Sequence, residues 1–144
     1  WTTRMMPCYR GMIRGFCSVA GSFGFGMGHA GLLVRFKPAA EAGSSLRGWL
    51  LQDTLPQLPA RPGIGSVHLF EGALPPQMTS EQRLRGADAG FDWALLVTGY
   101  SQDALAGLLQ AELGSAQLEA QGATGVLAAM YRMEYSIVRQ EVGA

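Results

Sequence analysis

A strand–helix–strand pattern occurs twice in this chain of 144 residues, and no other feature constrains the fold as strongly. Each copy begins and ends with a short apolar run of strand length. Between these runs, apolar residues recur at helical spacing. The two copies occupy, in chain order, residues 32–36, 46–58 and 66–70, then residues 93–97, 104–120 and 126–131. Two such units in succession predict one sheet with both helices on the same face.

The predicted fold class is therefore α+β. The order βαββαβ corresponds to a ferredoxin-like arrangement, with a four-stranded antiparallel sheet and helices on one face. Two helices can cover only one face of such a sheet. The other face needs a partner, so the pattern predicts an assembly as well as a fold. It does not predict a reaction.

The composition favours a small domain with part of its surface covered. Eleven basic and eleven acidic side chains cancel, which argues against nucleic acid or an anionic membrane as a partner. Charged residues make up only 15% of the chain and hydrophobic residues 48%, so we expect another subunit to cover some surface. No apolar run approaches the length needed to cross a bilayer.

The two cysteines, Cys8 and Cys17, lie nine positions apart without a CxxC motif. This spacing argues against zinc and iron–sulfur centres. Two reduced thiols are the simpler interpretation, from which we predict a cytoplasmic protein. A disulfide between the two cysteines is the alternative, which the sequence does not exclude.

Residues 1–31 differ in composition from the rest of the chain. Residues 12–20 are predicted to form a strand, and residues 21–31 a glycine-rich, flexible connector between modules. Residues 26–31 (GMGHAG) match G-x-G-x-x-G, but a dinucleotide site needs a helix after these glycines. A strand is predicted there instead, which argues against a nucleotide site.

Local signals refine the elements. Pro56 should kink or shorten the first helix. A capping box predicts a short helix at residues 79–87, and Ser101 is the predicted N-cap of the second main helix. Gly114-Ser115 should break that helix in two, with Gly122 just after its end. The third and fourth strands are predicted at residues 91–100 and 125–137.

The alternation of side chains sorts the strand residues between the two faces of the sheet. We predict that an all-apolar set lies under the helices: Leu32, Val34, Phe36, Val67, Leu69, Trp93, Leu95 and Val97. The alternate set is mixed: Leu33, Arg35, Ser66, His68, Phe70, Ala94, Leu96, Thr98, Met130, Arg132 and Glu134. A mixed face suits either a lined cavity or a partly wet dimer interface. In the fourth strand, Leu127, Ala129 and Tyr131 fit the inner face equally well.

The mixed face holds the candidate site residues. His68, central in its strand, is the candidate catalytic residue, as a general base or ligand; the alternative is a hydrogen-bonded structural histidine in an interface. The candidate ligand-binding residues are Arg35, Thr98, Arg132 and Glu134. The charged members of this set could bind a small anion, or they could simply pair across strands.

Three segments carry a resemblance to a known family. Residues 92–100 (DWALLVTGY), together with the order of the elements, resemble the dimeric α/β-barrel superfamily, and within it the EthD-like and stress-responsive barrel proteins. Residues 62–64 (PGI) and 84–88 (LRGAD) resemble the C-terminal module of bacterial proteins of unknown role that carry two such modules in tandem. The resemblance implies that residues 1–25 are the tail of a missing upstream module and that residues 26–144 form the barrel module.

The superfamily includes cofactor-free monooxygenases, heme enzymes and isomerases, so the fold alone does not choose a function. The resemblance is compatible with a small-molecule enzyme, monooxygenase- or isomerase-like, that has a cavity on the sheet face. The alternatives are a non-catalytic module that binds a small ligand and a structural or oligomerisation module. The expected partner is a second copy in a homodimer, or the missing tandem module. We predict no cofactor and no metal. The two histidines, His29 and His68, are too few for a histidine metal cage, and they are the only nitrogen ligands available to a heme.

Overall fold

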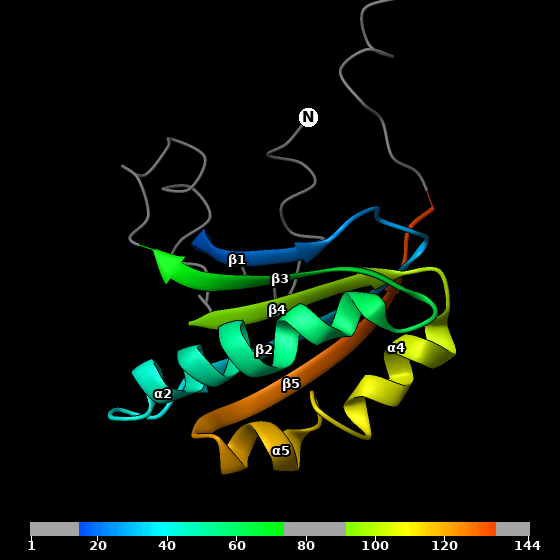
Figure 1. The fold of residues 1–144 in the computed structure, drawn as a ribbon. Helices are drawn as coiled ribbons and strands as arrows, with labels where there is room; N and C mark the ends of the chain where they lie inside the picture. Colours follow the sequence, from blue (N-terminus) through cyan, green and yellow to red (C-terminus); the bar gives the residue numbers. More distant parts are fainter. Residues whose placement is uncertain (1–14, 74–91, 135–144) are drawn as a thin grey trace, which may run out of the picture.

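The computed structural model describes residues 15–73 and 92–134, which form one five-stranded sheet with helices packed on one face (Figure 1). The strands are β1 (Phe16–Gly24), β2 (Ala30–Pro38), β3 (Ile64–Ala73), β4 (Trp93–Gly99) and β5 (Ala123–Arg132). The helical segments are α2 (Gly43–Gly48), η2 (Trp49–Thr54), η3 (Leu55–Ala60), α4 (Gln102–Leu109) and α5 (Ser115–Ala120). The predicted α+β class is confirmed.

The sheet has five strands where the sequence predicted four. Its order is β1-β3-β4-β2-β5, and every neighbouring pair is antiparallel. All four predicted strands are present, and residue 91 of the third and residues 135–137 of the fourth lie outside the described residues. The additional strand is β1, which overlaps the strand predicted at residues 12–20, of which 12–14 lie outside the described residues. It pairs with β3 and so extends the sheet that residues 30–132 build.

The segment predicted as a flexible connector is a hydrogen-bonded part of the sheet. β1 continues to Gly24, and the Phe25 amide donates to the Gly65 carbonyl at 3.1 Å. Gly28 has a positive φ of 62° and bridges to Gly99. A Cβ atom at Gly28 would clash with the Gly99 carbonyl, so this tight turn requires glycine. As predicted, a strand and not a helix follows these glycines.

The first predicted helix is a continuous helical run from Gly43 to Ala60 that changes its geometry twice. It passes from α-helix to a π-helical stretch at Trp49 and then to 3₁₀ turns at Leu55. Pro56 lacks the N–H that would bond to the Gln52 carbonyl in an α-helix. The expected irregularity at Pro56 is therefore a change in helix type and not a break.

The second half of the helical layer follows the local sequence signals. The Ser101 side chain accepts a hydrogen bond from the Ala104 amide at 3.2 Å, which confirms Ser101 as the N-cap of α4. α4 ends before Gly114, and α5 begins at Ser115. Gly122 follows α5 with a positive φ of 93°, as its predicted position required. The short helix predicted at residues 79–87 lies outside the described residues.

The hydrophobic core lies between the helices and one face of the sheet. η3 packs on β3 and β1, α4 on β2 and β4, and α5 on β5 (Figure 1). The fully buried side chains of this layer include Leu32, Val34, Leu46, Leu50, Leu55, Leu69, Leu95, Leu105, Leu108, Leu113 and Leu118. The predicted inner set is confirmed: all of its members are buried except Trp93, which is partly buried and stacks edge-on against Phe36.

Candidate functional site

The sheet face that the described helices leave uncovered, here named the open face, carries three rows of side chains across the five strands. Directly paired residues in antiparallel strands point to the same face, so the strand register defines each row. From β1 to β5, the rows are Val19, Phe70, Ala94, Arg35, Leu127; then Ser22, His68, Leu96, Leu33, Ala129; then Gly24, Ser66, Thr98, Gly31, Tyr131. The open face is thus largely apolar. Apart from Arg35 on β2 and Tyr131 on β5, its polar side chains lie on β1, β3 and β4.

A chain of hydrogen bonds links these polar groups. His68 Nδ1 lies 2.9 Å from Ser22 Oγ, and His68 Nε2 lies 3.1 Å from Ser66 Oγ. Ser66 Oγ lies 2.8 Å from Thr98 Oγ1, which donates to the Gly26 carbonyl at 3.3 Å. This chain of hydrogen bonds crosses β1, β3 and β4 and ends at the β1–β2 turn. Both nitrogens of the imidazole are therefore held by named partners.

Burial varies along this chain of hydrogen bonds. Ser66 and Thr98 are buried, His68 is half-buried and Ser22 is exposed. The chain thus begins in the packed sheet and reaches the surface at Ser22. The ring of Phe70 lies beside the imidazole, with 6.2 Å between the ring centres. The arrangement presents a positioned hydroxyl–imidazole pair next to an apolar surface.

Thr98 and His68, two of the predicted site residues, are brought together, with Ser66 between them. Arg35 is also on the open face and half-buried, but it lies two strands from His68 and in the neighbouring row. Leu96 and Ala94 of β4 stand between the two strands. The structure therefore groups Thr98 with His68 and leaves Arg35 apart from them.

The face predicted for the last strand was wrong. Met130 pairs with Leu32 and Arg132 pairs with Ala30, which places both on the helix-covered face of the sheet. Leu127, Ala129 and Tyr131 are on the open face instead. Residues 127–132 of β5 pair in regular register with residues 30–35 of β2. Positions 126–131 are all apolar or aromatic, so alternation within the strand could not sort its two faces.

Arg132 and Glu134 form an ion pair with each other, at 3.3 Å, and both side chains are largely exposed. Arg132 of β5 pairs with Ala30 of β2, whereas Arg35 of β2 pairs with Leu127 of β5. The two arginines therefore lie on different faces of the sheet and far apart along its strands. The predicted anion site that combined Arg35 with Arg132 and Glu134 is therefore not assembled. A surface ion pair of this kind contributes little to stability.

Sequence reasoning missed two residues of this site: Ser66, which it placed on the mixed face but not among the candidate residues, and Ser22. The strand was predicted to end at Ala20, since Gly21 and Gly24 suggested a connector. A β-bulge between Val19 and Gly21 lets β1 continue and turns Ser22 toward the open face. The alternation of Ser22, Phe23 and Gly24 after the bulge is the signal that could have indicated a continuing strand.

A second feature of the described residues is an open groove of about 580 Å³ at the loop between α4 and α5. It is lined by Leu109, Gln110, Ala111, Glu112, Gly114, Ser115, Ala116 and Gln117. Its lining is a loop and two helix ends, and the Glu112 carboxylate at its edge is engaged by a neighbouring arginine. The Glu112 carboxylate therefore has a structural role, because it pairs with Arg61.

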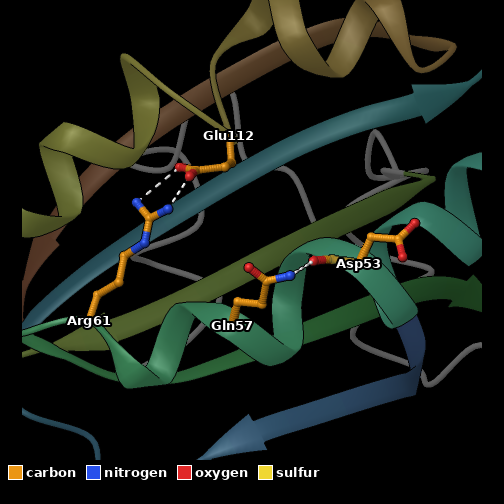
Figure 2. Close-up of polar contacts among 4 residues, drawn as sticks. All are labelled: Asp53, Gln57, Arg61 and Glu112. Atoms are coloured by element: carbon orange, nitrogen blue, oxygen red, sulfur yellow. Dashed lines mark hydrogen bonds and ion pairs between the residues drawn. The ribbon is translucent and has the colours of Figure 1, made fainter.

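Arg61 at the end of η3 forms a two-pronged ion pair with Glu112 (Figure 2). One guanidinium nitrogen lies 3.1 Å from Glu112 Oε2, and the other contacts Oε1. Figure 2 also shows the Gln57 amide donating to the Asp53 backbone carbonyl at 2.7 Å, where the π-helical and 3₁₀ segments meet. The ion pair ties the first helical run to the α4–α5 loop.

We expect this ion pair to make stability depend weakly on pH. Partial burial raises the pKa of the Glu112 carboxyl, but hydrogen bonds from Arg61 and the Glu112 amide, with the arginine charge, lower it by more. The pKa of the Glu112 carboxyl therefore lies below its ordinary value of 4.5. The contribution of the ion pair to the free energy of unfolding is complete above pH 4.5 and is lost as the pH falls through the lowered pKa. Glu112→Gln should lower the free energy of unfolding by about 0.5 kcal/mol at pH 7 and by less at pH 3.

Urea unfolding of the wild type and Glu112→Gln at both pH values measures this difference. Glu119→Gln, on the exposed side of α5, is the matched control and should lower the free energy of unfolding by less than Glu112→Gln at pH 7. An equal cost of Glu112→Gln at pH 7 and pH 3 would show that the ion pair does not contribute.

Within residues 15–73 and 92–134, no group of three or more histidine, cysteine, aspartate or glutamate side chains could hold a metal ion. None of the helices in these ranges has the length and apolar character that a membrane span requires. Cys17 is exposed on β1, and Cys8 lies outside the described residues. Comparisons with family models, curated proteins and solved structures find no match to this chain.

Proposed function

We propose that this chain is a small-molecule module of the dimeric α/β-barrel type, in which the open face of the sheet forms a ligand site around His68. The observation that carries the proposal is the hydrogen-bonded chain from Ser22 to Thr98, set in a largely apolar face. Ligand sites typically combine apolar walls with a few positioned polar groups. A purely structural face would not need a polar chain that reaches the surface.

The strand order supports the finer fold assignment within this proposal. Without β1, the order β3-β4-β2-β5 is the one that two interleaved strand–helix–strand units produce in a ferredoxin-like sheet. In barrels of this type, two such sheets pack face to face. A second copy packed on the open face would cover the apolar side chains of Phe70, Leu96 and Leu33 and enclose His68.

Two roles for His68 fit this site. In the binding role, the chain of hydrogen bonds orients a polar group of the ligand. In the catalytic role, which suits an isomerase-like or monooxygenase-like reaction, the imidazole accepts a proton through Ser22. The 2.9 Å separation between Ser22 Oγ and His68 Nδ1 favours proton transfer along this path.

Substitution of His68 tests the proposal. His68→Phe keeps an aromatic ring of similar size but removes both nitrogens, so we expect a loss of at least about tenfold in affinity for any ligand that binds at the site. Ligands come from a screen of small aromatic compounds by ligand-detected NMR, and affinities are measured by isothermal titration. Any turnover should be lost together with His68.

His29→Phe is the matched control, because His29 is an exposed histidine whose side chain is not part of the described hydrogen-bonded chain. It should leave affinity unchanged. A folded His68→Phe variant that binds the same ligands as tightly as the wild type would show that His68 is only a structural residue.

A further inference from the structure

The chain of hydrogen bonds around His68 has a defined direction, because its inner end is a carbonyl. The Gly26 carbonyl can only accept, so Thr98 donates its single hydroxyl proton there. Thr98 Oγ1 must then accept from Ser66, whose proton is used in that bond. Ser66 Oγ in turn can only accept from His68 Nε2.

It follows that a neutral His68 carries its proton on Nε2. The other ring nitrogen, Nδ1, is then an acceptor, and the Ser22 hydroxyl donates to it. The opposite direction would require Nδ1 to carry the proton and Thr98 to donate to Ser66. That arrangement would remove the Thr98 hydrogen bond from the Gly26 carbonyl.

We propose that this directional chain fixes Ser22 as a hydrogen-bond acceptor at the surface, so that the site binds ligands with a hydroxyl or N–H donor on an apolar body. The Ser22 proton is committed to His68, which leaves the lone pairs of an exposed oxygen for the ligand. Val19 and Phe70, in the adjacent row, supply apolar contact. The ligand class therefore includes phenols and apolar alcohols, and it excludes ethers of the same shape. This inference rests on the proposed function of the open face.

The tautomer is measured first, in the protein without ligand and at alkaline pH, by long-range ¹H–¹⁵N NMR of the histidine rings. We expect a single tautomer for His68, protonated at Nε2. Thr98→Val removes the hydroxyl while keeping a β-branched side chain, and it should release His68 into a mixture of tautomers. Thr98→Ser keeps the hydroxyl and should restore the single tautomer. A His68 protonated at Nδ1 in the wild type would overturn the direction of the chain.

The ligand class is measured next with two matched probes, phenol and anisole, titrated into the protein while backbone amide shifts are followed. Phenol can donate and anisole cannot, so phenol should bind about tenfold more tightly at the open face. Ser22→Ala should abolish this preference. Equal affinity of both probes at the open face would overturn the donor requirement and leave the proposed site intact. Binding of neither probe there at millimolar concentration would overturn the site itself, and with it this inference.

Discussion

Replacing Leu95 with alanine should lower the free energy of unfolding by about 2–5 kcal/mol, one of the largest effects expected for a single substitution in this chain. Leu95 lies on the central strand β4, is fully buried and faces the helical layer. Alanine would remove its apolar contacts and leave a cavity between sheet and helices, which closely packed elements can fill only in part. Urea or thermal unfolding measures the loss.

Leu96 is the matched control, because it is the next residue on β4 and points to the open face. It is half-buried in a single chain, so Leu96→Ala should cost only about 1 kcal/mol when measured at low protein concentration. If the open face packs against a second copy, the cost should grow as the protein concentration rises. Equal costs at Leu95 and Leu96 at low concentration would contradict the assignment of the two faces.

Much of the fold could be predicted from the sequence because its signals are local and agree with each other. The alternation of Leu32, Val34 and Phe36 with Leu33 and Arg35 gave the inner face of β2 correctly. The Ser101 N-cap and the Gly114 break were also correct, since capping and helix termination depend on a few neighbouring residues. These predictions needed no knowledge of distant contacts.

What could not be predicted depends on strand register and on bulges. The bulge after Val19 and the slip opposite Arg35 each change which side chains share a face, and neither leaves a strong mark in the sequence. For this reason, Ser22 was missed. Arg132 was placed on the wrong face because positions 126–131 of its strand are all apolar or aromatic and show no alternation. His68 and Thr98 were predicted correctly for the open face because β3 and β4 keep a regular register along the stretch that contains them.

The second large effect is expected at the exposed edge of the open face. Leu127 lies on β5, and its side chain is 60% exposed in the single chain. A glutamate at position 127 should change the free energy of unfolding of a single copy only slightly, since its charge stays in water. Packed against a second sheet, the same charge would lose its solvent on both copies, so Leu127→Glu should weaken association by about a hundredfold or more.

Met130→Glu is the control for this substitution. Met130 is a large apolar residue on the same strand and is also exposed, at 38%, but it is on the helix-covered face. It should leave association unchanged. A similar effect of both substitutions would indicate that the charge acts on β5 itself and not on an interface at the open face.

Sedimentation of the wild type, Leu127→Glu and Met130→Glu across the micromolar range tests whether a second copy covers the open face. We expect a dimeric wild type and Met130→Glu variant, and a monomeric Leu127→Glu variant with unchanged thermal unfolding at low concentration. A wild type that remains strictly monomeric throughout this range would contradict this expectation.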